Sequence, residues 1–422
     1  MNPIRLLHVT QGYFPGIGGT ERLIQRLSEE LVSQFGDSVT VYTSNCYSVE
    51  GFSDTRFPRM PAGKESLNGV DIRRFEVKTR LSRALFWPQR IAYRLRLPYH
   101  EWLRTAFHGP IIPGLANAIR AHPADVVAAS SFPLLHMFTS LGASHASGRP
   151  CVFYGGLHPE DQWGFDRSII HAAIQAADRY VAYSPYEARF VCERGASTDR
   201  VRVLPLGVDI APFETANRDR MRHELGLSGD EPLIGFIGQV GGHKGVHTLL
   251  EAMPLVWKEF PESRVLIAGA RARFAETIDR QISAWPKQFQ SKVIRRYDFD
   301  ERAKAALFAA IDVLAYPSGY ESFGLAFLEA WAAGRPVVSC RRGAIPDVVR
   351  AGVDGLLVPF QDAVRLAAAL AALVRNPAWA RALGAAGQRK VRSQLTWDRV
   401  AARFRDTLTE VIGGTGSNAA RC

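Results

Sequence analysis

Short apolar runs alternate with amphipathic stretches along most of the chain. Residues 21–35 place Leu23, Ile24, Leu27 and Leu31 at the three- and four-residue spacing of a helix that buries one face. The apolar runs are too short to form helices, so they predict strands. In the first half these strands cover residues 4–9, 39–42, 125–129, 151–154 and 180–183. Short apolar strands separated by helical segments predict a parallel sheet with helices on both faces.

The second half repeats this pattern after a polar, turn-rich segment from about residue 210 to 232. With 422 residues the chain is too long for one ordinary core. We therefore predict an α/β fold of two Rossmann-like, doubly wound domains, residues 1–209 and 210–396. Residues 397–412 predict an amphipathic helix that is a candidate to cross back onto the first domain, and residues 413–422 a flexible tail. The predicted strands of the second half are residues 233–238, 265–268, 313–316, 337–339 and 356–358.

The two predicted domains also indicate where a ligand would bind. In doubly wound folds, ligands bind beyond the carboxyl ends of the strands. We therefore expect a ligand in a cleft between the two domains, where the carboxyl ends of both sheets face each other.

Cysteine usage and hydropathy indicate the compartment. The five cysteines, at positions 46, 151, 192, 340 and 422, are scattered and have no Cys-x-x-Cys spacing. This argues against a disulfide framework and a structural zinc site, and it fits a reducing compartment. The N-terminus lacks the long apolar core of a signal peptide, and the longest apolar stretch, residues 126–143, is interrupted by Pro133 and His136. We expect a buried strand and a helix there, and a cytoplasmic protein.

The chain is basic, with a net charge of +11 and a pI of about 9.6, which favours anionic partners. Residues 77–100 contain no acidic residue, and their Lys and Arg alternate with Leu, Phe, Trp and Tyr. This composition predicts a surface for an anionic membrane across residues 78–104, and hence peripheral association with the inner face of the membrane. The alternative is a solvated helix pair that covers the first domain. We expect no nucleic-acid partner.

Two glutamates bracket an apolar run in residues 320–334. Glu329 lies among alanines and large apolar residues, where an acid is costly unless it is paired. Glu321 precedes the predicted helix, and Ser322 is expected to cap its first turn. The backbone N–H groups of Phe323, Gly324 and Leu325 would then face a phosphate at the positive end of the helix. N–H groups that donate to a phosphate, flanked by carboxylates that accept from hydroxyl groups, suit a sugar nucleotide. The alternative is that both glutamates form structural salt bridges.

Two glycine-rich loops each join a strand to a helix. In residues 16–21, Gly18 and Gly19 permit close approach of the backbone to an anionic group, although a tight turn without a ligand is the alternative. The loop does not match the dinucleotide-binding fingerprint. In residues 238–245, glycines surround Lys244, which is expected to place its charge on a diphosphate. No Ser or Thr follows a Gly-Lys pair, so this is not a Walker loop.

His158 lies in a loop after the predicted strand 151–154. Loops at strand ends are where α/β proteins place reactive groups. His158 is a candidate to exchange a hydrogen bond with a substrate hydroxyl, and the alternative is a histidine that only stabilises its own loop.

Taken together, these motifs resemble those of the retaining glycosyltransferases of family 4, which have the GT-B fold. The similarity covers almost the whole chain, and its most specific element is the Glu-x7-Glu spacing of Glu321 and Glu329. The other matching segments are Gly18-Gly19…Glu21, Ala182-Tyr183-Ser184, Gly207-Val208-Asp209, Lys244-Gly245, Gly334-Arg335-Pro336, Pro346-Asp347 and Gly355-Leu356-Leu357.

The resemblance implies a nucleotide-sugar donor held mainly by the second domain, without a metal or other cofactor. Glu329 would accept from the ribose hydroxyls, and Glu321 would lie by the sugar or phosphates. Lys244 and the N–H groups after Glu321 would stabilise the departing diphosphate. His158 matches a histidine near the reacting sugar. The implied activity is retaining transfer of a hexosyl-type sugar to a hydroxyl of a glycan, glycolipid or polysaccharide precursor of the cell envelope.

One departure from the family concerns the donor site. Gln239 stands where the family commonly has Arg, which removes a charge-assisted contact to the diphosphate. Another cation, from among Arg271, Arg273 and Arg342, is then expected to replace it, or the donor differs. Two alternatives remain open: a nucleotide-sugar epimerase or hydrolase of the same shape, and a non-catalytic binding subunit.

Overall fold

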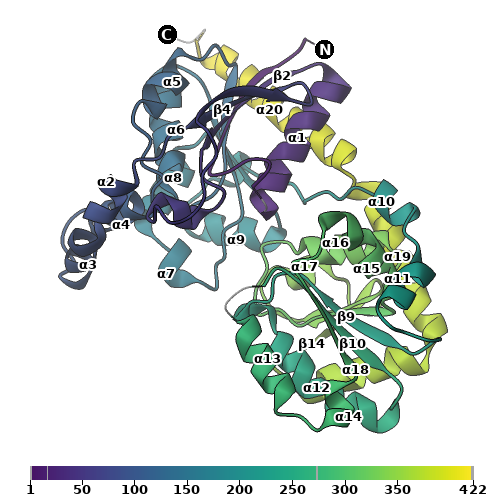
Figure 1. Cartoon of the computed structure of the whole chain (residues 1–422). Coiled ribbons are helices and arrows are strands. Elements are labelled where there is room, and N and C mark those ends of the chain that lie inside the picture. The colour runs from purple at the N-terminus through teal and green to yellow at the C-terminus, as the bar shows by residue number, and fades with distance from the viewer. Residues whose placement is uncertain (1, 17, 272–273, 420–422) are drawn as a thin grey trace. The chain divides into compact units, whose positions relative to one another are not determined.

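The computed structural model describes residues 2–16, 18–271 and 274–419, and the chain divides into two units (Figure 1). Unit 1 comprises Met1–Leu206 and Trp397–Cys422, and unit 2 comprises Gly207–Thr396. The boundary predicted from the sequence, between residues 209 and 210, lies three residues further along.

Unit 1 is built on an eight-stranded sheet in the order β3-β4-β2-β1-β5-β6-β7-β8. Every strand is parallel to its neighbours except β3. The central strands β5 and β6 are buried at every position, because helices cover both faces. The strands are β1 (Arg5–Thr10), β2 (Ser38–Ser44), β3 (Gly63–Leu67), β4 (Val70–Phe75), β5 (Val126–Ala129), β6 (Cys151–Tyr154), β7 (Arg179–Ala182) and β8 (Val201–Val203).

The prediction of a parallel sheet is wrong at one edge of unit 1. Strands β3 and β4 form an antiparallel hairpin whose turn residues, Asn68 and Gly69, have φ values of 51° and 79°. Two left-handed residues in a two-residue loop match the twist of the flanking strands, so Asn-Gly fixes this hairpin.

The helices of unit 1 include the C-terminal one. α20 packs beside α1, its Phe404 ring lies 4.7 Å from that of Tyr154, and Arg405 forms a buried ion pair of 2.8 Å with Asp37. α20 extends to residue 419, so the predicted flexible tail is helical over residues 413–419. The helices are α1 (Gly19–Phe35), η1 (Val49–Phe52), α2 (Thr79–Ala84), α3 (Phe86–Arg94), α4 (His100–His108), α5 (Leu115–Ala121), α6 (Leu135–His145), α7 (Gln162–Phe165), α8 (Ser168–Ala176), α9 (Pro185–Glu193), η2 (Thr198–Arg200) and α20 (Trp397–Ala419).

The apolar stretch of residues 126–143 forms β5 and most of α6, as predicted. Among the helices that the structure describes, none has the length and hydropathy needed to cross a bilayer.

Unit 2 is built on a six-stranded, fully parallel sheet in the order β11-β10-β9-β12-β13-β14. Its strands are β9 (Leu233–Ile237), β10 (Arg264–Gly269), β11 (Val293–Tyr297), β12 (Val313–Tyr316), β13 (Val337–Cys340) and β14 (Gly355–Val358). Its helices are α10 (Ala211–Glu214), α11 (Arg218–Glu224), η3 (Gly242–Lys244), α12 (Val246–Glu259), α13 (Ala275–Ser283), α14 (Lys287–Gln290), η4 (Glu301–Ala303), α15 (Lys304–Ala310), α16 (Leu325–Ala332), α17 (Ile345–Val348), α18 (Ala363–Arg375) and α19 (Pro377–Gln394).

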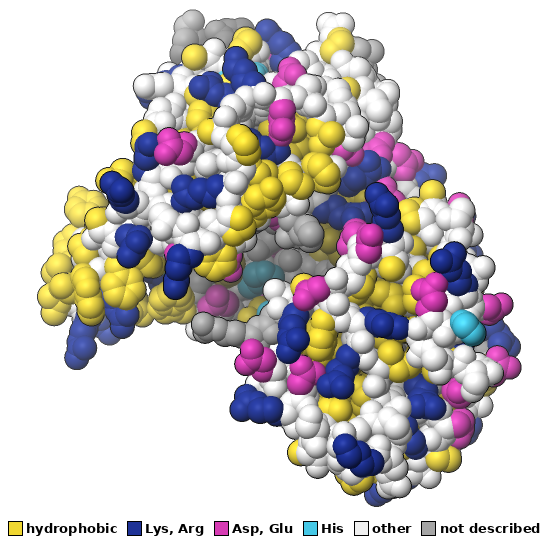
Figure 2. Space-filling model, viewed as in Figure 1, with side chains coloured by type: hydrophobic (Ala, Val, Ile, Leu, Met, Phe, Trp, Pro, Cys, Tyr) yellow, Lys and Arg dark blue, Asp and Glu magenta, His cyan; other side chains and the backbone are white. Residues whose placement is uncertain are grey.

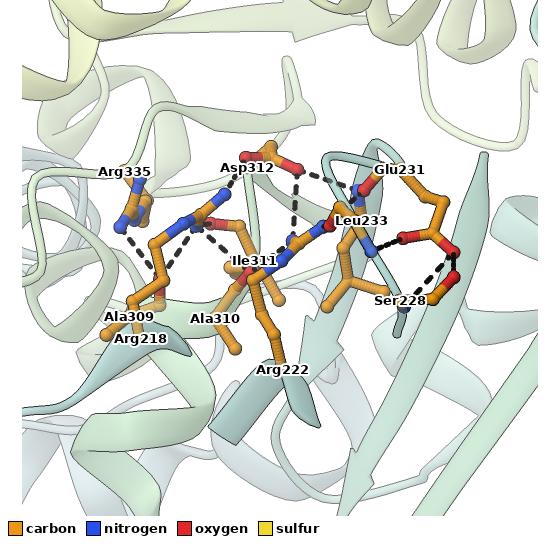
Figure 3. Close-up of polar contacts among 11 residues, drawn as sticks. Arg218, Arg222, Ser228, Glu231, Leu233, Ala309, Ala310, Ile311, Asp312 and Arg335 are labelled. Carbon is orange, nitrogen blue, oxygen red and sulfur yellow. Dashed lines mark hydrogen bonds and ion pairs between the residues drawn. The ribbon is translucent and has the colours of Figure 1, made fainter. Parts of the chain in front are cut away.

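Three arginines converge on the carboxyl end of α15 (Figure 3). Arg218 donates to the carbonyls of residues 309, 310 and 311 at 2.9–3.1 Å, Arg222 to Ala310 at 3.0 Å and Arg335 to Ala309 at 2.7 Å. Cations suit the negative end of a helix, where the last carbonyls lack helical partners. Asp312 accepts from Arg218 at 2.6 Å and from the backbone of Leu233 at 2.8 Å, so the network joins α11 and α15 to β9.

Candidate functional site

The loops after β9 and β12 are joined by hydrogen bonds in unit 2. The two strands are neighbours in the parallel sheet, so both loops leave its carboxyl edge. The carbonyl of His243 accepts from the backbone N–H of Gly319 at 2.7 Å and from the hydroxyl of Ser318 at 3.3 Å. The ring of His243 stacks on that of Tyr320 at 4.8 Å. Burial lowers the pKa of His243, and Lys244 lowers it further, which favours a neutral ring in this stack.

These loops bring together two of the predicted site residues. The Nζ atom of Lys244 lies 2.6 Å from Oε1 of Glu321, and the side chains are only 15% and 10% exposed. An ion pair that excludes most water is stronger than a surface pair. Lys244 and Glu321 therefore form a largely buried ion pair at the carboxyl edge of the sheet.

Glu329 lies on α16, and it is buried as predicted. Its Oε1 atom is 2.7 Å from the Nζ of Lys304, the first residue of α15, and Lys304 also reaches Glu301 at 2.9 Å. Burial lowers the pKa of Lys304, but the two carboxylates outweigh this and the pKa is raised. The sequence analysis did not identify Lys304, because no local spacing connects residues 25 positions apart.

The prediction that Ser322 caps the helix is wrong. α16 begins at Leu325, and its N-cap is Gly324, which has a φ of 98° and makes no side-chain cap. A side chain at Gly324 would collide with the ring of Phe327, so only glycine fits both the left-handed backbone and the space. Of the three N–H groups expected at the helix start, only that of Leu325 belongs to its first turn. Donor binding by Ser322, Phe323, Gly324 and Leu325 stays a prediction.

In unit 1, His158 lies in the loop between β6 and α7. Its ring packs edge-on against Phe165 at 5.4 Å, and its carbonyl accepts from the N–H of Asp161 at 2.9 Å. Asp161 in turn caps α7 by accepting from the N–H of Gly164. The loop of His158 is thus held by contacts with residues that follow it closely in the chain.

A buried carboxylate that the sequence analysis missed holds the same loop. Glu187 of α9 accepts from the N–H groups of Gly156 and Leu157 at 2.8 and 2.9 Å, from the hydroxyl of Tyr180 at 2.7 Å and from the N–H of Tyr183 at 2.8 Å. Burial raises the pKa of Glu187, against these hydrogen bonds, which lower it.

The neighbouring glycine makes room for this carboxylate. A Cβ atom at Gly155 would lie 2.6 Å from both carboxylate oxygens of Glu187, so the close approach needs a glycine. The segment Ser184-Pro185-Tyr186-Glu187 has the spacing of a capping box, which was the available signal for this residue. Glu187 nevertheless reaches past Ser184 to the loop after β6.

Gly18 and Gly19 lie at the start of α1 in unit 1. The Glu21 carboxylate folds back towards Gly12 and Gly18, where a Cβ at Gly18 would collide with it, and it accepts from Gln11 at 2.9 Å. Space for Glu21 therefore accounts for Gly18 without a ligand, and donor binding by the two glycines stays a prediction.

Comparison with known proteins identifies the family. Residues 17–211 match "Glycosyltransferase Family 4" and residues 217–390 match "Glycosyl transferases group 1". A D-inositol 3-phosphate glycosyltransferase 1 from Catenulispora acidiphila is 32% identical over 391 residues, covering 87% of this chain and 88% of the relative. The chain belongs to glycosyltransferase family 4.

Other family members and solved structures extend this assignment. A D-inositol 3-phosphate glycosyltransferase from Xylanimonas cellulosilytica is 35% identical over 246 residues, and the match spans 58% of that relative and 56% of this chain. HepE of Anabaena, solved with UDP and glucose, has a TM-score of 0.72 at 18% identity, over 96% of this chain and 100% of that one. Sucrose-phosphate synthase of Thermosynechococcus elongatus has a TM-score of 0.71 at 21% identity, over 97% and 100%. These likenesses confirm the GT-B fold.

The cations expected to compensate for Gln239 differ in their surroundings. Gln239 is exposed, and Arg271 pairs with Asp279 at 3.3 Å. Arg342 stacks over Phe360 at 4.5 Å, and the Phe360 ring approaches Gly319 in the loop that leads to Glu321. Arg273 lies outside the described residues. Arg342 is therefore the candidate that the packing connects to the Lys244–Glu321 pair.

Proposed function

We propose that this glycosyltransferase is a retaining, metal-independent enzyme that transfers a hexosyl-type sugar from a nucleotide sugar to an acceptor hydroxyl. The observation that carries the proposal is the 2.6 Å ion pair between Lys244, after β9, and Glu321, in the loop that continues into the helix of Glu329. It supports a donor site in which one surface supplies cations, helix N–H groups and carboxylates.

Each group has a role in the proposal. Lys244 and the amino end of α16 stabilise negative charge on the leaving diphosphate, which is the part that a metal ion plays in other transferases. Glu329, fixed by Lys304, accepts from the ribose hydroxyls. Glu321 contacts the sugar or its phosphates, and His158 is the proposed hydrogen-bond partner of the reacting sugar.

UDP-sugars are the first donors to test, because HepE was solved with UDP-glucose. The names of the relatives favour a phosphorylated polyol such as inositol 3-phosphate as one acceptor class. The basic, aromatic segment of residues 78–104 favours another, a lipid-linked glycan at the cytoplasmic face of the membrane, within cell-envelope or polysaccharide synthesis.

The test follows sugar transfer from a panel of nucleotide sugars, with and without inositol 3-phosphate or a glycolipid acceptor, in the presence of a chelator. We expect acceptor-dependent release of nucleoside diphosphate and a product whose anomeric configuration by proton NMR equals that of the donor. Glu321→Ala should abolish transfer with an unchanged circular dichroism spectrum. Inverted product, or loss of activity with the chelator, would refute retention or metal independence respectively.

A non-catalytic subunit is the second candidate, favoured by Gln239 in place of the family's Arg. It predicts nucleotide binding without turnover under every donor and acceptor combination. Diphosphate release without an acceptor would instead indicate a hydrolase.

A further inference from the structure

Helices α2, α3 and α4 form a group at one side of unit 1 that is poorly buried for so apolar a segment (Figure 1). Within residues 77–100 only four positions are buried: Val77, Thr79, Ser82 and Ala92. These four anchor the segment to unit 1, and the remaining side chains face solvent fully or in part.

The exposed side chains of this segment include many large apolar ones. Nine of the nineteen large hydrophobic residues that are exposed in the described chain lie within residues 81–102. Tyr99 is 78% exposed, Trp87 67% and Leu95 62%. Trp87 and Ile91 are four residues apart on α3, so they share one helical face. Figure 2 shows hydrophobic side chains gathered over α2 and α3, with basic side chains among them. Apolar groups concentrated in this way mark an interaction surface.

The same segment carries positive charge, and residues 77–100 contain no acidic residue. Arg80, Arg83, Arg90, Arg94 and Arg96 are all exposed. The guanidinium of Arg90 lies 5.2 Å from the ring of Phe86 and 5.8 Å from that of Trp87, which keeps charge and aromatic groups together.

The acids at the borders of the segment have partners of their own. Glu76 pairs with Lys78 at 2.9 Å, and Asp54 pairs with Arg56 at 2.6 Å. Glu101 accepts from the Ser168 hydroxyl and from the Ile169 N–H. Of the five arginines, Arg83 also acts on Asp54, where it helps to lower the pKa of that carboxyl, so most of the positive charge of the segment faces no acid among these neighbours.

We propose that the α2–α4 surface, residues 78–102, docks onto a lipid bilayer that contains anionic headgroups. A bilayer interface takes both kinds of side chain at once, with Trp, Tyr and Leu at the depth of the headgroups and arginines on the phosphates. A second copy of this chain would face five arginines with five arginines. Nucleic acid would leave the aliphatic side chains without a partner. This proposal deepens the proposed function by naming the membrane, and it rests on that function only for the lipid-linked acceptor.

A cavity of about 740 Å³ adjoins this surface. Its lining combines Arg56 and Arg83 with the rings of Phe86, Trp87 and Phe107, and it includes the paired Asp54. Because Arg56 is held by Asp54, Arg83 and the three rings are the part of the lining that suits a phosphate headgroup and the first carbons of its chains. Within this proposal, the cavity is where the headgroup of one anionic lipid of the docked bilayer would bind.

The experiment is co-sedimentation of the full chain with phosphatidylcholine vesicles, with and without phosphatidylglycerol, at low and high salt. We expect binding only with phosphatidylglycerol, weakened by salt. Replacing Arg90, Arg94 and Arg96 together by Gln should lower the partition coefficient about a hundredfold. The control replaces Arg381, Arg389 and Arg399, exposed on α19 and α20, by Gln, and it should retain most of the binding.

A second variant, with Trp87, Ile91 and Leu95 replaced by Ser, keeps every charge and should still bind at least tenfold more weakly. Absence of binding at low salt, or an equal loss in the control, would overturn the proposal. So would a dimer in light scattering that the α3 variants abolish. Vesicle binding needs no donor or acceptor. If it fails, the proposed sugar transfer is unaffected. If the protein binds vesicles but transfers no sugar, the membrane proposal stands and the proposed function fails.

Discussion

The two glutamates of the Glu-x7-Glu motif should affect nucleotide binding with opposite signs. Lys244 and Glu321 are paired at 2.6 Å, so a diphosphate that engages Lys244 must share it with a carboxylate or displace that carboxylate. Hydrogen bonds to charged groups contribute about 1.5–3 kcal/mol. Glu321→Gln removes the competing charge while keeping the shape of the side chain. We expect nucleoside diphosphate to bind about tenfold more tightly, since tenfold corresponds to about 1.4 kcal/mol, while sugar transfer falls.

Glu329→Gln should act in the other direction. Glu329 is predicted to accept from the ribose hydroxyls, and it is fixed by Lys304 at 2.7 Å. The glutamine loses the charge-assisted hydrogen bonds, which are about twice as strong as neutral ones, and it also loses the ion pair with Lys304. We expect the affinity for nucleoside diphosphate to fall about tenfold.

Isothermal titration calorimetry on the two variants measures both effects. The unphosphorylated nucleoside is the control ligand: it should still register Glu329→Gln and should be indifferent to Glu321→Gln. If Glu321→Gln weakens diphosphate binding or leaves it unchanged, Lys244 is not the cation that the diphosphate engages, and the pair is a structural salt bridge.

Three other outcomes are expected. Lys244→Met should lower kcat by about 10²–10³ in steady-state kinetics, because it removes a cation from the leaving group; an unchanged kcat would exclude Lys244 from the reaction. Arg222→Ala should lower the free energy of unfolding in urea by about 2–3 kcal/mol, since the carbonyls of Gly229 and Glu231 lose their Arg222 donor and that of Ala310 keeps only Arg218. Arg220→Ala, exposed on the same helix and paired with Glu224, should cost less than about 1 kcal/mol; equal effects would contradict the role of the network. The pKa of Glu187 is raised in the folded state above its ordinary value of 4.5. Its contribution to the free energy of unfolding is therefore complete below pH 4.5 and is lost as pH rises through the folded-state pKa. The free energy of unfolding of Glu187→Gln, measured across pH, should lack this decline, and parallel curves for the variant and the unaltered protein would contradict the prediction.

The sequence predicted most of the central strands and failed at three of the four sheet edges. The apolar runs identified ten strands: nine in the interior of a sheet, such as β6 with its four buried residues, and the edge strand β14. It missed β3 and β11, whose residues are mostly exposed or half-buried, and also β4 and β8. An edge strand needs no continuous apolar run, so hydropathy alone does not reveal it. The Asn68-Gly69 turn was the one signal that would have predicted the β3–β4 hairpin.

The start of α16 shows where local rules reach their limit. Ser322 and Gly324 both have the chemistry of an N-cap, and the sequence favours Ser. Gly324 takes that place because the ring of Phe327 occupies the space where a side chain would stand. A choice between two acceptable caps is thus made by packing that no local pattern contains.

The residues that hold the site differ from those that define its motif. Glu321 and Glu329 are visible from their spacing. Lys304 has no such signal, and the capping-box spacing of Glu187 does not reveal the loop that it holds, because each acts on a segment brought close only by the fold. Substituting either supporting residue is expected to impair sugar transfer. An activity assay alone would therefore not distinguish these two residues from the catalytic groups. Nucleotide affinity separates them: Lys304 supports the ribose acceptor in unit 2, whereas Glu187 supports the loop of His158 in unit 1. Loss of Lys304 should therefore weaken diphosphate binding, and loss of Glu187 should lower turnover while the diphosphate affinity of unit 2 persists.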